Sequence, residues 1–201
     1  MPDLHPDATS VLMDVITQRR SMGLARLKPD AVPVEILQQM MEAANWAPSN
    51  GDTEPWRFTI FSGDGREELA NAFGEAYRTD IGDGAFDQVA YDGYRARAYA
   101  APVWIAIGME PGKNEDGSLA ESQDEEIMAV ACAVQNFHLI ATTYGLSGMW
   151  HSKGTSTHPA VAKALGLDSP SRLLGLFFLG YPEIQWPEGE RRPLESKVRW
   201  A

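Results

Sequence analysis

The chain has 201 residues, of which 44% are hydrophobic and 22% are charged, values typical of a globular protein with a sizeable core. Its 17 Lys and Arg residues face 28 Asp and Glu residues, and the resulting net charge of −11 repels nucleic-acid phosphates and anionic lipid. We therefore expect a single domain over residues 1–201, with no nucleic-acid partner and no membrane partner.

The N-terminal stretch lacks the basic start and the following apolar run of a signal peptide, and no apolar run approaches the roughly 20 residues of a membrane span. A cytoplasmic location is expected. Cys132 is the only cysteine, which excludes an intrachain disulfide and a multi-cysteine metal site. Within the sequence AVACAV it is predicted to be a small buried core residue and not a nucleophile.

Apolar spacing and the Gly, Pro and Asn residues between apolar runs predict a helix-rich α+β chain. In the first half we expect a helix from Thr9 or Ser10 to the segment 19–21, a helix with Pro33 at its first position, a loop over 47–55, a strand over 56–62, a turn over 63–65 and another helix.

The second half begins with residues 77–101, which are expected to be partly helical, with a mobile segment that covers a site. After them we expect a strand over 102–109, a solvent loop over 111–118, a long helix with a capping box of Ser122 and Glu125 and a stop at Gly145, a central strand over 173–181, and an arm over 182–201.

The Pro-rich, charged arm carries apolar side chains that an isolated subunit would leave in water. They are Trp186, Leu194, Val198 and Trp200. Wrapping around a second subunit would bury them. The sequence therefore predicts a homodimer.

Several common catalytic patterns are missing from the sequence. No GxGxxG follows a strand, and there is no GxxxxGK[ST], HExxH or GxSxG. The four histidines are scattered, so a hydrolase triad and a metal site lose support together with dinucleotide and P-loop binding. Any catalysis is expected to depend on a cofactor.

Four segments share an order and spacing that resemble one known family. They are Arg19–Arg20–Ser21, APSNGDTEPWRF over 47–58, GLSGMWHS over 145–152 and LFFLGYPE over 176–183. Together they resemble the FMN-dependent nitroreductase family along nearly the whole chain. The length and the MWHS segment are most similar to the small NAD(P)H nitroreductases. The resemblance implies a mixed, mostly antiparallel sheet flanked by helices, in a homodimer with exchanged arms and FMN at the interface.

The resemblance also implies which residues bind FMN. Arg19, Arg20 and Ser21 would contact its phosphate, ribityl chain or ring edge, a role that suits guanidinium groups, although a solvated helix end is the alternative. Trp56 is expected to pack in the core. The loop residues that would reach the flavin held mainly by the other subunit are Trp46, Pro48, Ser49 and Asn50.

Two further segments are implied in FMN binding. Arg191 would complete the phosphate site, with a solvent-exposed arginine as the alternative. Gly23 stands where relatives usually carry another arginine, so phosphate binding would rest on Arg19, His151 or Arg191 and FMN affinity would be reduced. The strand-end residues that would meet the flavin and its phosphate are Gly148, Met149, Trp150, His151 and Ser152, with a structural role for His151 as the alternative.

The activity implied is a ping-pong transfer of hydride from NAD(P)H through FMN to a nitroaromatic, quinone or similar acceptor. Flavin N5 would carry the chemistry, and no side chain is expected to be catalytic. Two alternatives stay open, a specialised flavin enzyme such as a dehalogenase or dehydrogenase and a non-catalytic flavin-binding protein. The residues linked to nicotinamide binding are Ile140, Ala141, Thr142, Thr143, Tyr144 and Gly145.

Overall fold

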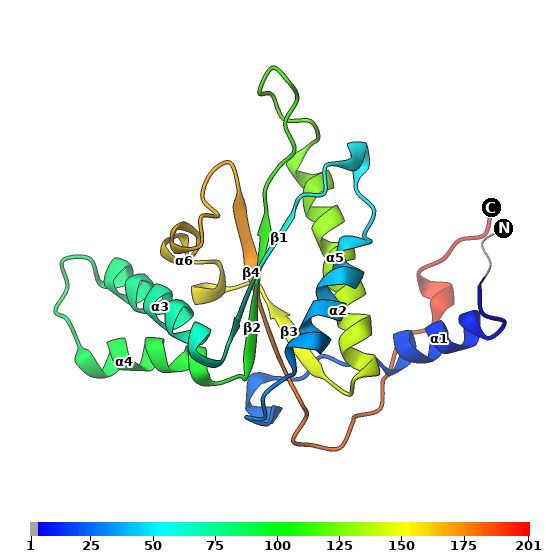
Figure 1. Cartoon of the computed structure of the whole chain (residues 1–201), viewed down its shortest axis with the longest axis horizontal. Helices are drawn as coiled ribbons and strands as arrows, with labels where there is room; N and C mark the ends of the chain where they lie inside the picture. Colours follow the sequence, from blue (N-terminus) through cyan, green and yellow to red (C-terminus); the bar gives the residue numbers. More distant parts are fainter. Residues whose placement is uncertain (1–3) are drawn as a thin grey trace.

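The computed structural model describes residues 4–201 (Figure 1). Residues 1–3, the start of the stretch considered as a signal peptide, lie outside the described residues. The elements are α1 (Ala8–Gln18), α2 (Val34–Asn45), β1 (Trp56–Ser62), α3 (Arg66–Ile81), α4 (Gln88–Ala96), β2 (Val103–Met109), α5 (Gln123–Thr143), β3 (Ser147–His151), α6 (Pro159–Ala164) and β4 (Arg172–Gly180). None of the helices within 4–201 combines the length and apolar character that a membrane crossing requires.

The strands form one sheet in the order β1-β2-β4-β3, and every neighbouring pair is antiparallel. The two inner strands, β2 and β4, are the most apolar segments of the chain, and every residue of β2 is buried. A parallel bridge between Ser21 and Gly148 extends the pairing beyond β3. The α+β class predicted from the sequence is confirmed.

Helices cover both faces of the sheet, with α2 and α5 on one side and α3, α4 and α6 on the other (Figure 1). On the α5 side, Phe137 packs edge-on against Phe177 with ring centroids 5.0 Å apart. On the α3 side, Trp104 makes edge contacts with Phe73 at 6.2 Å and Phe178 at 5.5 Å. The sheet therefore separates two apolar cores, and Trp56 is buried in the first, as predicted.

The long helix α5 begins and ends where the sequence signals predicted. The Ser122 hydroxyl accepts from the Glu125 backbone N–H, and the Glu125 carboxylate accepts from the Ser122 N–H, which completes the capping box. Gly145 follows the helix with a φ of 69°, a left-handed conformation that glycine adopts without strain. The predicted strands over 56–62, 102–109 and 173–181 are confirmed within one residue at each end.

Three local predictions were wrong. Helix α1 begins one residue before Thr9, with Asp7 at the cap position and no side-chain cap bond, because the chain enters the helix through a turn at His5. Pro33 precedes α2 as its cap residue and is not its first helical residue. Cys132 is exposed, because α5 turns this position away from the sheet while Ala133 and Val134 face it.

Two elements were not foreseen from periodicity. Strand β3 has five residues with a glycine and no clean alternation, and α6 has six residues, so each is too short for its own pattern to identify it. Each depends on a neighbour: β3 pairs with β4, and Val161 of α6 is buried beside α3.

Residues 77–101 are partly helical, as predicted. The Asp87 carboxylate caps α4 by accepting from the Val89 and Ala90 N–H groups. Tyr77 of α3 lies 5.5 Å from Phe86 and 6.0 Å from Tyr91, ring centroid to centroid, so α4 is held on α3 by aromatic contacts. The mobility of this segment and its covering of a site stay predictions.

The first part of the arm, residues 182–187, packs on the end of α1 and the segment that follows it, and the arm is exposed from residue 188 onward. Leu27 bridges Pro182, and the Glu183 N–H donates to the Arg26 carbonyl at 2.8 Å. The Trp186 indole donates to the Gln18 carbonyl at 2.7 Å and is half-buried. Part of the arm therefore packs on its own chain, while Leu194, Val198 and Trp200 are exposed.

Gly148 should tolerate no side chain. A Cβ there would lie 2.0 Å from the Phe178 carbonyl oxygen and 2.6 Å from the Phe177 ring. We expect Gly148→Ala to lower the free energy of unfolding by about 1–3 kcal/mol or more, because the clash is with backbone of the paired strand. Gly93→Ala is the matched control, since a Cβ in this α4 position meets nothing within 4 Å and should stabilise by about 0.5–1 kcal/mol. Urea unfolding measures both, and equal stability of the two variants would contradict the tight β3–β4 contact.

Candidate functional site

The segment Arg19–Arg20–Ser21 leaves α1 in an extended conformation and joins two other elements. Ser21 bridges Gly148 of β3, and the Met22 N–H donates to the Gly148 carbonyl at 3.3 Å. The Arg20 carbonyl accepts from the Ser147 hydroxyl at 3.0 Å and lies 3.2 Å from Nε2 of His138 on α5. The structure thus brings together two of the segments that the sequence singled out.

His138 is a buried part of this junction. Because the Arg20 carbonyl can only accept, Nε2 of His138 must carry the proton, which fixes the neutral tautomer. Burial, and to a smaller extent the nearby Arg19 cation, lower the pKa of His138 to about 4. The imidazole is therefore uncharged at neutral pH, so it adds no positive charge to the two arginines beside it.

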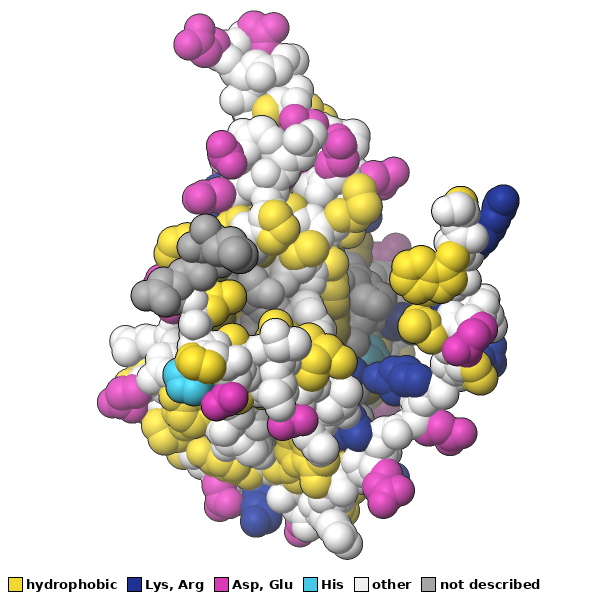
Figure 2. All heavy atoms as spheres, turned by 90° about the vertical axis from the view of Figure 1, so that its right-hand side faces the viewer, with side chains coloured by type: hydrophobic (Ala, Val, Ile, Leu, Met, Phe, Trp, Pro, Cys, Tyr) yellow, Lys and Arg dark blue, Asp and Glu magenta, His cyan; other side chains and the backbone are white. Residues whose placement is uncertain are grey.

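The arginines and the arm enclose a cavity of about 420 Å³. Burial lowers the pKa of Arg19, and the Arg191 and Arg20 guanidinium groups lower it further, so three cations lie close together. No carboxylate pairs with any of them within residues 4–201. Figure 2 looks at this side of the molecule and shows Lys and Arg side chains at and beside the projecting arm. The cavity is lined by Ile16, Thr17, Arg19, Arg20, Gln135, Gly189 and Arg191.

Repulsion among three unpaired cations would be relieved by a bound anion. The three arginines do not offer equal numbers of donors. Among residues 4–201, the Arg19 side chain makes one long hydrogen bond, 3.3 Å to the Ser21 hydroxyl, and the Arg191 guanidinium donates only to the carbonyl of the preceding residue. Arg20 donates to three backbone carbonyls. Arg19 and Arg191 are thus the cations whose remaining donors can meet a ligand.

The β3 residues lie next to this junction but do not line the cavity. The Trp150 indole donates to the Leu174 carbonyl at 3.0 Å, and Gly175, with a φ of 139°, leaves room for it, since a Cβ there would lie 2.6 Å from Nε1. Met149 packs against the core on the α3 side. The side chains of Met149 and Trp150 are therefore used for packing, which leaves the Gly148 backbone as the part of β3 closest to Ser21.

His151 ends β3 with its ring oriented by a buried partner. Its Nδ1 lies 2.9 Å from the Ser156 hydroxyl, and Ser156 is fully buried. Burial lowers the pKa of His151, as do the Arg97 and Lys153 charges. Ser152 lines a different cavity, next to α6, so it and the arginines do not share one pocket in this chain. A contact of His151 or Ser152 with a cofactor stays a prediction.

The loop residues Trp46, Pro48, Ser49 and Asn50 do not line the arginine cavity. Asn50 contacts Glu125 near the start of α5, whereas Arg20 is held by His138, 13 positions further on, or about 20 Å along the helix. The Trp46 side chain is 80% exposed. That the loop serves a site on another subunit stays a prediction.

The segment 140–145 contributes in part to a neighbouring cavity of about 670 Å³ beneath the arm. Thr142 and Gly145 line it, together with Thr17 and Gly189, which also line the arginine cavity. Ile140 and Thr143 face the apolar groove beside α1, and Tyr144 donates to the Gln39 side chain at 2.5 Å. Nicotinamide binding by this segment stays a prediction.

Sequence reasoning missed several residues of the site. Gln135 is the one polar side chain that α5 adds to the arginine cavity, and Thr17 and Gly189 line both cavities. The bond between His138 and the Arg20 carbonyl was not foreseen from the sequence. The signal in the sequence for a close approach of the arm to the Arg20 side chain is Gly189, two residues before Arg191.

The fold and the cavity together define an α+β protein with a cationic pocket where α1, α5 and the arm meet. The sequence matches the family model described as "Nitroreductase family" over residues 16–181. The chain belongs to this family, which confirms the resemblance seen in the sequence.

Curated relatives and solved structures cover almost the whole chain. "Putative NAD(P)H nitroreductase YfhC" of Bacillus subtilis is 28% identical over 189 residues, covering 94% of this chain and 93% of its own. "Putative NAD(P)H nitroreductase YdjA" of Escherichia coli is 28% identical over 173 residues, covering 86% and 89%. A nitroreductase-like family protein from Bacillus cereus shares the fold with a TM-score of 0.73, 26% identity and coverage of 100% and 98%.

A second solved structure shares the fold at lower identity. It is the FMN-dependent nitroreductase NfnB from Mycobacterium smegmatis in complex with NADPH, with a TM-score of 0.68, 22% identity and coverage of 97% of this chain and 100% of that one. The fold predicted for this chain is therefore found along the full length of both neighbours.

The low pKa of His138 makes stability depend on pH. The unfolded histidine has a pKa near 6.5 and the folded one a pKa of about 4, so the stabilisation is complete above pH 6.5 and is lost as the pH falls toward 4. Between pH 7 and pH 5 this linkage should remove about 2 kcal/mol from the free energy of unfolding. His138→Gln keeps a donor for the Arg20 carbonyl and removes the titration. Between pH 7 and pH 5 its free energy of unfolding should therefore fall by about 2 kcal/mol less than that of the wild type.

Urea unfolding at the two pH values measures this difference. His5→Gln is the matched control, because His5 lies in the exposed turn before α1. The same pH dependence in wild type and His138→Gln would show that His138 is not held neutral by burial.

Proposed function

We propose that this protein is an FMN-dependent oxidoreductase that uses NAD(P)H to reduce nitroaromatic, quinone or similar electron-poor acceptors. The observation that carries the proposal is the cluster of arginines without carboxylate partners beside the Ser21–Gly148 bridge, in a chain of the nitroreductase family. A curated relative of nearly full coverage carries the name "Putative NAD(P)H nitroreductase YfhC".

The residues present fit the phosphate end of FMN. A phosphate dianion suits guanidinium donors, and Arg19 and Arg191 supply them from two segments that line the cavity, the end of α1 and the arm. The Ser21 hydroxyl lies next to Arg19 and adds a neutral donor. The charge balance supports the same ligand, because a chain with a net charge of −11 keeps these cations unpaired.

When bound, FMN would supply the redox chemistry by accepting hydride from NAD(P)H and passing it to the acceptor in a ping-pong cycle. The side chains of the protein would bind and orient FMN. Arg19 and Arg191 would hold the phosphate, and the Gly148 backbone would lie close to the cofactor because no side chain intervenes. In this proposal, no side chain that lines the cavity transfers a proton. Substitutions of these residues should therefore change activity mainly by changing how tightly FMN is bound.

The complete site is proposed to need a second copy of the chain. Helix α1 has no buried residue although Val11, Leu12 and Met13 are apolar, and with α5 it borders an apolar groove of about 350 Å³. The exposed end of the arm adds Leu194, Val198 and Trp200 to this unburied apolar surface. In this proposal, residues 1–201 form one domain whose arm, 182–201, reaches the partner subunit.

The homodimer would place FMN at the interface. The loop 46–50, which does not line the arginine cavity of its own chain, would meet the flavin of the other subunit. A cytoplasmic location, where NAD(P)H is available, is part of the same proposal.

The visible spectrum tests the cofactor directly. Purified protein reconstituted with FMN should show oxidised-flavin bands that bleach on anaerobic addition of NADPH or NADH. Arg19→Met should raise the FMN dissociation constant about 10- to 100-fold, because a charged phosphate contact is lost. Arg26→Met removes the same charge outside the cavity and should leave the constant unchanged. Protein that binds no flavin after reconstitution would overturn the proposal.

Light scattering tests the dimer. The wild type should have twice the mass of the 22.1 kDa chain. Leu12→Asp places a carboxylate in the groove beside α1 and should shift the protein toward monomer and weaken FMN binding. Leu119→Asp, on the exposed loop before α5, is the matched control. A monomeric wild type that still holds FMN would exclude a shared site.

A further inference from the structure

Arg20 differs from the other two arginines in how its guanidinium is used. Its Nε donates to the Pro187 carbonyl at 2.9 Å, and Nη1 donates to the carbonyls of Thr17 at 2.6 Å and Arg19 at 2.8 Å. The planar, multi-donor guanidinium is suited to such simultaneous bonds, which a lysine ammonium at a single point cannot reproduce. Arg20 therefore joins the end of α1 to the arm through backbone carbonyls.

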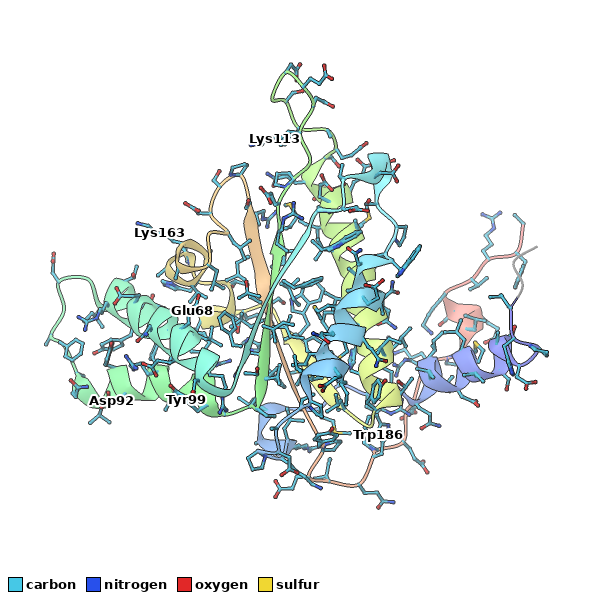
Figure 3. All side chains as sticks on the ribbon, in the orientation of Figure 1. Glu68, Asp92, Tyr99, Lys113, Lys163 and Trp186 are labelled. Carbon is cyan, nitrogen blue, oxygen red and sulfur yellow. The ribbon has the colours of Figure 1, made fainter. Side chains whose placement is uncertain are left out.

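The arm is shaped to accept this guanidinium. A Cβ on Gly189 would lie 2.2 Å from Nη2 and 2.4 Å from Cζ of Arg20, so a side chain there would displace the guanidinium from the backbone of the arm. The Trp186 indole makes a second tie to the end of α1 through the Gln18 carbonyl at 2.7 Å. Figure 3 labels Trp186 on the arm, near the C-terminal end of α5.

The bound stretch of arm ends two residues before Arg191. From residue 188 onward the arm is exposed, yet Arg191 lines the same cavity as Arg19. The contacts at Pro187 and Gly189 are thus the last ones that fix the direction of the chain toward this cavity. Without them, the Arg191 side chain would lose its position, and ordering it again would cost conformational entropy on binding.

We propose that Arg20 is a positioning residue, which holds residues 186–189 of the arm so that Arg191 stays over the anion site, and that it does not bind the phosphate itself. This inference rests on the proposed FMN site. It assigns Arg20 a role different from the direct contact that the family resemblance implies.

A double-mutant cycle on the FMN dissociation constant tests the proposal, using quenching of flavin fluorescence. Arg191→Met should raise the constant about 10- to 100-fold. Arg20→Met should raise it by a similar factor, and the double variant should be no weaker than Arg191→Met alone, because one interaction is lost in each case. Arg20→Lys should behave as Arg20→Met. Retained affinity in Arg20→Lys together with multiplying losses in the double variant would show that Arg20 binds the phosphate directly.

A second measurement needs no flavin. The Trp186 indole N–H resonance, assigned by its loss in Trp186→Phe, reports whether the arm is attached to α1. It should move toward the position of a solvent-exposed indole in Arg20→Met and Arg20→Lys. Gly189→Val should give the same shift and the same weaker FMN binding, and Gly189 is exposed on the arm, outside both apolar cores. An unchanged resonance in all three variants would overturn the inference.

Arg192→Met is the matched control. It removes the same charge from the same arm, and the Arg192 side chain makes no hydrogen bond within residues 4–201 and does not line the cavity. It should change neither the resonance nor the FMN dissociation constant. Failure of the wild type to bind FMN would overturn the proposed function and this role together, whereas FMN binding with multiplying losses would overturn only the role of Arg20.

Discussion

The arrangement of the site depends on one backbone carbonyl, that of Arg20. Two donors from different elements meet it, the Ser147 hydroxyl at the start of β3 and the His138 imidazole within α5. A carbonyl with two such partners cannot move without leaving buried donors unpaired, which costs more than a single lost hydrogen bond at the surface. The extended segment 19–21 is thereby fixed against both the sheet edge and the longest helix. This fixes the backbone from which the Arg19 and Arg20 side chains reach the cavity.

This junction explains how an acidic protein maintains a cationic pocket. The charged side chains around the segment are arginines, and the histidine beneath them is kept neutral by burial, so the pocket gains no further charge and no internal anion. The repulsion among the arginines is a cost in the ligand-free protein. The same repulsion would favour binding of an anion, which would relieve it.

Two apolar surfaces of the subunit are exposed to solvent, the outer face of α1 and the end of the arm. Both belong to elements that also contribute to the arginine cavity, because α1 leads into the segment 19–21 and the arm carries Arg191. Dimerisation and cofactor binding would therefore use the same two elements. On this view the arm has two parts, a first part held by its own chain through Arg20 and Trp186 and a second part offered to the partner.

The sequence by itself determined the features that depend on neighbours along the chain: the strands over 56–62, 102–109 and 173–181, the Ser122–Glu125 capping box, and the four family segments in order. Only the tertiary structure decided that Cys132 is exposed, that the edge strand β3 exists, and that Arg20 contacts Pro187, 167 positions away. The physical reason is that periodicity and caps act over a few residues, whereas burial, strand pairing and the bonds of a guanidinium depend on which distant segments the fold brings together.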